Sequence, residues 1–394
     1  MAIPAKKIVI LILSLFCFAS FAQAGAPVSF VKRKWVVKLK QNSFFNRKPY
    51  QFAKPVVDGD KIFVGVQKGF FYGIDANRGK KLWIYRTQGP VYAAARVQEE
   101  VVYFPDFKGT VYALHKETGK LLWISKVDGE VMSAPLILGD KIYIVTLARE
   151  LAQLDRATGN ILWQTSQSLR ERGFSIVGAA DPVLAEGHIL AGFSDGSFAA
   201  FNPANGEILW SKQLGERSAE FRDVDGTVLL APSTAVHAEP IVSLSNDEAR
   251  TALRTSGNLA YISSADGRMF ALNPKTGDVV WEAPFGGVNS AALAGDLLYV
   301  TAGGVVYCVK AENGEQIWEQ NLEIPGTSSP ALYDKWLSVV ATKGHIYFID
   351  RIHGDVLYNY YVKGGSYSDP IMADNRLYLL SNAGRLYAFQ YKSP

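Results

Sequence analysis

The sequence predicts an all-β protein, an eight-bladed β-propeller of four-stranded antiparallel blades that is closed by its N-terminal strand. Two observations support this fold class. One short motif recurs along the chain, and most of the tryptophans that end its copies lie about 40 residues apart, the period of a propeller blade. Apolar residues within each copy alternate with a period of two, which is typical of strands and excludes a helical solenoid.

Each copy of the motif contains an aromatic or apolar pair, a short turn that carries glycine, and an apolar strand that ends in tryptophan. Two further strands precede the motif, as in residues 134–145, where Gly139-Asp140 marks a hairpin turn. The copies span residues 71–83, 111–123, 151–163, 198–210, 269–281, 306–318, 346–358 and the truncated 386–390.

The turn before the last strand of a blade is built on a pattern such as Asp-x-x-x-Gly-Lys, as in Asp75–Lys80. The aspartate supplies a side-chain acceptor, and the glycine adopts a positive φ. We expect the tryptophan that follows to wedge between adjacent blades, so its recurrence indicates packing rather than a stacked cofactor.

The two ends of the chain are expected to complete one blade together. The last copy stops after a third strand, Leu386–Gln390, whereas residues 30–40 contain a strand with Trp35 and no blade before it. Pairing these segments closes the ring and removes an open sheet edge. Each blade has one tryptophan or tyrosine at this position, so Trp35 and the seven later positions predict eight blades.

Residues 1–24 are predicted to be a secretory signal peptide, followed by a single propeller domain over residues 25–394. Lys6-Lys7 precede an apolar stretch, and Ala22-Gln23-Ala24 matches the small-x-small pattern of a cleavage site. Export by a cleavable leader places the protein outside the cytoplasm.

The two cysteines argue against a lipid anchor and a disulfide. The residues before Cys17 lack the Leu-small-small-Cys pattern of bacterial lipoproteins, so no lipid anchor is expected. Cys308 alone remains after cleavage, and we expect it to be a small buried apolar residue.

The charge of the chain is close to balanced. The formal net charge of +4 falls to +2 without Lys6 and Lys7, which argues against a nucleic-acid partner. The basic run Lys32-Arg33-Lys34 is expected to be a solvated strand edge rather than a membrane-binding patch.

The repeat period fails in two places. Residues 166–178 stretch the interval between Trp163 and Trp210, and residues 216–254 lengthen the next one, with an insertion expected at about 226–256. Extra residues that do not extend strands form loops, and loops on a rigid scaffold commonly carry recognition. We therefore place the functional surface there.

No catalytic constellation is apparent in the sequence. The five histidines lack metal-ligand spacing, and the glycines lie mostly in hairpin turns rather than in a phosphate-binding loop. The segment Asp223–Gly226 lacks the rest of a calcium loop. We expect no enzyme activity, no cofactor and no metal. The histidines are His115, His188, His237, His345 and His353.

Residues 113–123 and 271–281 resemble the pyrroloquinoline-quinone-type propeller repeat. Two families share this repeat: quinone-dependent dehydrogenases, and BamB, the propeller subunit of the machinery that assembles outer-membrane β-barrels. The dehydrogenases commonly stack their quinone near a vicinal cysteine disulfide beside a calcium site. Cys308 is the one cysteine outside the leader, so the resemblance favours the BamB family.

The resemblance implies a partner-binding site in the two irregular regions. In the BamB family, a Leu-x-Leu-Arg loop and an Asp-x-Asp pair in neighbouring blades contact the POTRA domains of the barrel-inserting partner. Gln167, Leu169 and Arg170 occupy the first place here, with Gln167 in place of leucine, and Asp223 and Asp225 occupy the second. Leu169 is suited to an apolar anchor and Arg170 to a planar donor. The alternative for the aspartate pair is a turn that ends at glycine.

The resemblance implies a non-enzymatic periplasmic scaffold at the inner face of the outer membrane, a monomer within a complex. It would bind the POTRA domains of a BamA-like protein, which would also hold it at the membrane, and present nascent outer-membrane proteins by strand pairing at blade edges. The alternatives are a quinoprotein or small-ligand binder that uses the central channel, and a generic interaction propeller of the cell envelope.

Overall fold

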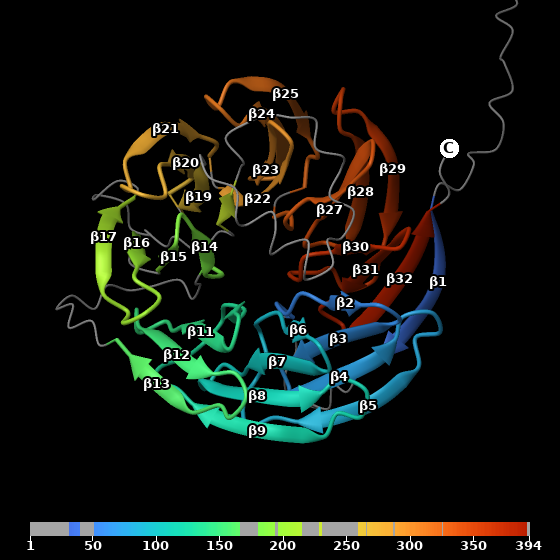
Figure 1. Ribbon diagram of the computed structural model, residues 1–394. Coiled ribbons are helices and arrows are strands. Elements are labelled where there is room, and N and C mark those ends of the chain that lie inside the picture. The colour runs from blue at the N-terminus through green and yellow to red at the C-terminus, as the bar shows by residue number, and fades with distance from the viewer. Residues whose placement is uncertain are drawn as a thin grey trace, which may run out of the picture.

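The computed structural model describes residues 31–39, 51–165, 180–193, 196–214, 228–230, 259–264, 266–286, 288–324 and 326–391. These residues form eight four-stranded antiparallel sheets arranged as blades around a ring (Figure 1). The predicted eight-bladed propeller is therefore confirmed. Within the described residues, no helix is long and apolar enough to cross a membrane.

The first four blades follow one another along the chain, and each has strands A to D from the innermost to the outermost (Figure 1). Blade 1 contains β2 (Val56–Asp58), β3 (Lys61–Val66), β4 (Phe70–Asp75) and β5 (Lys81–Arg86). Blade 2 contains β6 (Arg96–Gln98), β7 (Val101–Pro105), β8 (Thr110–His115) and β9 (Leu121–Lys126). Blade 3 contains β10 (Leu136–Leu138), β11 (Lys141–Val145), β12 (Leu151–Asp155) and β13 (Ile161–Gln164). Blade 4 contains β14 (Val183–Ala185), β15 (His188–Gly192), β16 (Ser197–Phe201) and β17 (Ile208–Gln213).

The second half of the ring repeats this order until the last blade. Blade 5 contains β18 (Leu229–Leu230), β19 (Ala260–Ser264), β20 (Arg268–Leu272) and β21 (Val279–Pro284). Blade 6 contains β22 (Val288–Ala294), β23 (Leu297–Ala302), β24 (Val305–Lys310) and β25 (Gln316–Asn321). Blade 7 contains β26 (Ala331–Tyr333), β27 (Trp336–Val340), β28 (His345–Asp350) and β29 (Val356–Tyr361). Blade 8 contains β30 (Ile371–Ala373), β31 (Arg376–Leu380), β32 (Arg385–Tyr391) and β1 (Val31–Lys38).

Blade 8 joins the two ends of the described chain, as predicted. Strand β1 pairs antiparallel with β32, from Val31 opposite Tyr391 to Lys38 opposite Arg385 (Figure 1). Lys32, Arg33 and Lys34 are exposed on this outermost strand, in agreement with the expected solvated edge.

Tryptophans of the outer strands link the blades at seven of the eight junctions. The indole nitrogen donates a hydrogen bond of 2.8 to 3.2 Å to a main-chain carbonyl in the turn between strands C and D of the following blade. The predicted wedge between blades is thus confirmed. The seven pairs are Trp35–Ala76, Trp83–Lys116, Trp123–Arg156, Trp163–Ala204, Trp210–Pro274, Trp281–Ala311 and Trp318–Arg351.

The glycine of the same turn makes room for the indole. At Gly119, which has a φ of +68°, an added Cβ would lie 2.6 Å from the ring of Trp83. The turn glycines of the other six pairs also face the indole of the preceding blade. The repeated glycine is therefore required by packing against the neighbouring blade, as well as by its backbone conformation.

We expect the change Gly119→Ala to destabilise the fold more than Gly139→Ala. Both glycines have a positive φ, but nothing lies within 4 Å of a Cβ at Gly139. Each alanine should cost about 1 to 2 kcal/mol of conformational strain. Displacement of the Trp83 indole should add about 1 to 3 kcal/mol at Gly119 alone. Urea unfolding of the two variants measures the difference, and equal free energies of unfolding would contradict this packing role.

The junction between blades 7 and 8 lacks this glycine turn, because strands C and D of blade 8 come from opposite ends of the chain. Tyr358 takes the tryptophan position in β29. Tyr391 lies 4.6 Å from Trp336 and 4.5 Å from Tyr333, measured between ring centroids. Aromatic packing therefore replaces the indole-to-carbonyl link at this junction.

Because neighbouring strands in each blade are antiparallel, the connections between them alternate between two opposite faces of the ring. The turns from strand B to C and the connections from strand D to the next strand A lie on one face, which we call the DA face. The turns from A to B and from C to D lie on the opposite face, which we call the AB face.

Candidate functional site

The five residues predicted to bind a partner lie outside the described residues. Gln167, Leu169 and Arg170 lie between β13 and β14, and Asp223 and Asp225 lie between β17 and β18. The described strands that flank both segments are a strand D and the next strand A, so they end and begin at the DA face.

The expected insertion at 226–256 overlaps a described strand. Leu229 and Leu230 form β18, the innermost strand of blade 5. Residues 231–258 connect β18 to β19, a strand A to a strand B, and the described ends of these strands lie at the AB face. The described strand ends that flank residues 215–227 thus lie at the DA face, and those that flank residues 231–258 lie at the AB face.

Asp181 links the inner ends of three blades on the DA face. Its carboxylate accepts a hydrogen bond of 2.6 Å from the main-chain N–H of Ala134 in blade 3. It also pairs with the Arg96 guanidinium of blade 2 at 3.2 Å. Asp181 lies two residues before β14, so these bonds position the start of that strand.

A buried carboxylate organises the same face between blades 1 and 2. The Asp106 carboxylate accepts hydrogen bonds from the main-chain N–H groups of Gly89 at 2.7 Å, Lys108 at 3.0 Å and Thr110 at 3.1 Å. It also accepts one from the hydroxyl of Tyr112 at 2.8 Å. Burial, together with the Asp106 carboxylate, raises the pKa of Tyr112 well above its ordinary value. Four donors satisfy this fully buried aspartate, which indicates a structural role.

An open pocket of about 940 Å³ lies on the DA face between blades 2 and 3. Main-chain hydrogen bonds from Phe107 to Pro90 and from Leu147 to Glu130, both 2.7 Å, connect the B-to-C turns to the preceding connections. Apolar side chains predominate in the lining, with two lysines and one glutamate among them. The lining residues are Pro90, Phe107, Lys108, Lys126, Gly129, Glu130, Leu147 and Ala148.

Sequence reasoning missed this pocket, although a signal was present. Phe107 and Leu147 lie 40 residues apart at the same place in the repeat, just after strand B. Polar residues and glycine dominate such turns. A large apolar residue there in two successive blades is the feature that points to a surface.

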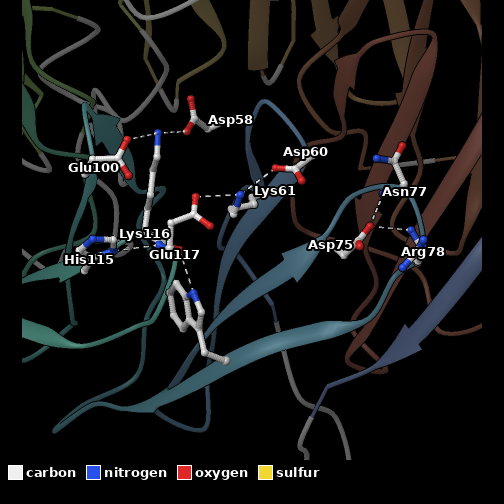
Figure 2. Close-up of polar contacts among 11 residues, drawn as sticks. Asp58, Asp60, Lys61, Asp75, Asn77, Arg78, Glu100, His115, Lys116 and Glu117 are labelled. Carbon is white, nitrogen blue, oxygen red and sulfur yellow. Dashed lines mark hydrogen bonds and ion pairs between the residues drawn. The ribbon is translucent and has the colours of Figure 1, made fainter.

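The AB face carries a charged cluster between blades 1 and 2 (Figure 2). Lys116 lies 3.1 Å from Asp58 and 3.5 Å from Glu100, measured between nitrogen and oxygen. Lys61 lies 2.8 Å from both Asp60 and Glu117. Each of the four carboxylates in these pairs has a lysine partner.

These ion pairs shift the pKa of Lys61 and tie the two blades together. Hydrogen bonds to Asp60 and Glu117 raise the pKa of the Lys61 amine above its ordinary value. Asp58 and Lys61 belong to blade 1, whereas Lys116 and Glu117 follow β8 in blade 2. The main-chain carbonyl of Lys116 also accepts the indole hydrogen bond of Trp83. The cluster is therefore a structural link between blades.

The described residues offer little reactive chemistry. Among them, no group of three or more histidine, cysteine or acidic side chains is arranged to hold a metal ion. Cys308 is fully buried, as expected, and burial raises the pKa of its thiol to about 11. The thiol therefore stays protonated at neutral pH and is a poor nucleophile.

Comparison with protein families identifies one match along nearly the whole described chain. The model of the family of the outer membrane protein assembly factor BamB matches residues 32–114, 95–303 and 302–393.

Curated proteins similar in sequence to this chain are also named outer membrane protein assembly factor BamB. The outer membrane protein assembly factor BamB of Legionella pneumophila is 24% identical over 53% of this chain and 50% of its own length. The protein of that name from Bordetella pertussis is 26% identical over 49% of this chain and 45% of its own length. The chain spans about half the length of the curated relatives it matches.

Solved structures share the propeller fold. BamB from Moraxella catarrhalis superimposes with a TM-score of 0.72 and 18% identity, over 92% of this chain and all of that chain. A europium-containing methanol dehydrogenase gives a TM-score of 0.71 and 14% identity, over 92% of this chain and 94% of that chain. At these identities the two likenesses show the fold alone.

Proposed function

The chain belongs to the BamB family of outer membrane protein assembly factors, and from this membership we propose that it is a non-enzymatic periplasmic scaffold for outer-membrane protein assembly. The observation that carries the proposal is the family match, which extends from residue 32 to residue 393. The scaffold docks on the POTRA domains of a BamA-like barrel-assembly protein at the inner face of the outer membrane.

We propose that the DA face carries this docking surface. The segments that contain Leu169 and Arg170, and Asp223 and Asp225, lie between strands whose described ends are at this face in adjoining blades. Leu169 supplies an apolar anchor and Arg170 a planar, bidentate donor, the residue types that dominate interface energetics. Gln167 and the two aspartates complete the proposed contact.

The outer strands of blades 1 and 2 are suited to bind client segments by strand pairing. Leu82 and Ile84 on β5, and Leu122 and Ile124 on β9, are each more than 40% exposed. Both strands are the outermost of their blades, so their outer edges have main-chain groups that no blade strand pairs. An apolar, open edge is the kind of surface to which an extended segment adds as a further strand.

The double change Leu169→Ala and Arg170→Ala should abolish copurification of the protein with its barrel-assembly partner. Loss of both the anchor and the bidentate donor should weaken binding by about 3 to 5 kcal/mol. The matched control replaces another exposed leucine and cation, Leu357→Ala with Lys335→Ala on blade 7, and should copurify as the wild type does. Copurification of the first variant at the wild-type level would overturn this site.

A quinone-dependent dehydrogenase is the second candidate, favoured by the fold it shares with the methanol dehydrogenase. The described residues contain no metal-binding cluster to support it. Titration of the purified protein with pyrroloquinoline quinone and calcium decides between the two. Saturable binding with dehydrogenase activity would replace the scaffold proposal.

A further inference from the structure

Four aromatic side chains form a continuous line on the DA face of blades 8, 1 and 2. Tyr367 lies 5.8 Å from Phe52, Phe52 lies 5.6 Å from Tyr92, and Tyr92 lies 5.4 Å from Phe107, measured between ring centroids. We call these four residues the aromatic arc. Phe107 also lines the pocket between blades 2 and 3, so the arc leads into that pocket.

The core of the propeller does not use these side chains. Phe52 and Tyr367 are 41% and 43% exposed, whereas the residues directly before and after each are at most 1% exposed. Tyr92 follows the same pattern, because it is half-buried between the fully buried Val91 and the nearly buried Ala93. Alternation along the chain therefore turns the neighbours into the core and the aromatic side chains outward.

The arc repeats at equivalent positions of successive blades. Phe52, Tyr92 and Met132 lie 40 residues apart, each four residues before the strand A of its blade, and Tyr367 holds the same place before β30. Large apolar residues thus recur at a position that faces outward. Repeated exposed aromatic residues are typical of a binding surface.

Hydrogen bonds of the residues next to the aromatic side chains hold the segments of the arc in place. The Ser368 hydroxyl donates to the carbonyl of Ala53 at 2.8 Å, which joins the residues next to Tyr367 and Phe52. The main-chain N–H of Gln67 donates to the Gln51 side chain at 3.1 Å. The arc is therefore preorganised for binding.

Exposed lysines lie beside the arc, and the half-buried carboxylate of Asp369, two residues after Tyr367, accepts a hydrogen bond from the main-chain N–H of Ser329. Lys54 is exposed two residues after Phe52, and Lys108 and Lys126 are exposed beside the pocket. Glu130 is the acidic residue of the pocket lining. A ligand with apolar side chains and an excess of negative charge complements this surface.

We propose that the aromatic arc binds extended, acidic segments of unfolded outer-membrane proteins that carry alternating aromatic residues. The four rings follow one another at centroid distances of 5.4 to 5.8 Å, so the arc is long enough to contact two or three same-side residues of an extended segment, which repeat about every 6.7 Å. Membrane strands alternate apolar and polar residues and place aromatic residues near both interfaces. The inference rests on the proposed function, since it takes its ligand from outer-membrane protein assembly.

The test measures binding of a fluorescent peptide to the purified protein. The peptide has about ten residues, the length of one membrane strand, with phenylalanine or tyrosine at alternate positions and aspartate or glutamate between them. The triple change Phe52→Ser, Tyr92→Ser and Tyr367→Ser should weaken binding at least about tenfold. The control Ile352→Ser, at a residue that is 65% exposed in the turn between β28 and β29, should change it less than about twofold.

A charge-reversal variant and a stability control complete the test. Lys54→Glu with Lys108→Glu should weaken binding of the acidic peptide and strengthen binding of the same peptide with lysine in place of its acids. The melting temperature of each variant should stay within about 3 °C of the wild type. Absence of saturable peptide binding to the wild type, or equal affinity of the triple variant, would overturn the inference.

Copurification separates this inference from the proposed function. The arc variants should retain the barrel-assembly partner, whereas Leu169→Ala with Arg170→Ala should lose that partner and still bind the peptide. If the wild-type protein binds the peptide but copurifies with no barrel-assembly protein, the docking proposal is wrong and the inference about the aromatic arc is supported.

Discussion

A chain that lacks residues 31–38 should fail to fold cooperatively. The deletion removes β1, which covers the edge of β32 and places Trp35 against the turn of blade 1. Loss of the half-buried Trp35 side chain costs about 1.5 to 3 kcal/mol, and each lost main-chain hydrogen bond costs roughly 1 kcal/mol more. The sum is comparable to the whole stability of a typical domain, about 5 to 15 kcal/mol.

A circular permutant provides the control for this deletion. Val31 and Tyr391 are register partners, so a short Gly-Ser linker can join them. New termini fit in the turn at Gly139-Asp140, where there is open space beside the glycine. The permutant should unfold cooperatively in urea, close to the wild type. Cooperative unfolding of the deletion variant at the wild-type midpoint would show that β1 is dispensable for closure.

The change Asp106→Ala should lower the free energy of unfolding by about 3 to 5 kcal/mol, because it leaves several buried donors without an acceptor. Three main-chain N–H groups and the Tyr112 hydroxyl lose their partner together. The donors come from both the connection before blade 2 and the turn inside it, so the change should also loosen the pocket beside Phe107.

The matched change Tyr112→Phe should cost only about 1 kcal/mol, since the aspartate keeps its three main-chain donors. Urea unfolding of both variants gives the comparison. Equal losses for the two variants would mean that Asp106 does not organise this face.

The regular part of the fold could be predicted because it depends on residues close in sequence. The alternation of strand residues, the turn at Asp75–Lys80 and the 40-residue interval between Trp83 and Trp123 each define a blade. The closure of the ring was also predictable, because the C-terminal copy of the motif lacks a fourth strand and the N-terminal segment around Trp35 has one strand without a blade. What the pattern did not reveal is the packing reason for each turn glycine, which becomes visible only against the indole of the neighbouring blade.

The surfaces were harder to predict because they depend on the closed ring. Tyr367 and Phe52 are 315 residues apart in the sequence and come together only when blade 8 meets blade 1. Asp106 resembles an ordinary turn residue until Gly89 and Tyr112 surround it. The proposed docking residues Leu169 and Arg170 lie outside the described residues, so they stay predictions from the sequence.

The most direct test of the scaffold proposal is affinity capture from a cell-envelope extract, with mass spectrometry of the proteins retained. The wild-type chain should enrich a barrel-assembly protein that carries POTRA domains, and Leu169→Ala with Arg170→Ala should not. A wild-type chain that retains no such protein, while its blades are folded, would contradict the proposed function.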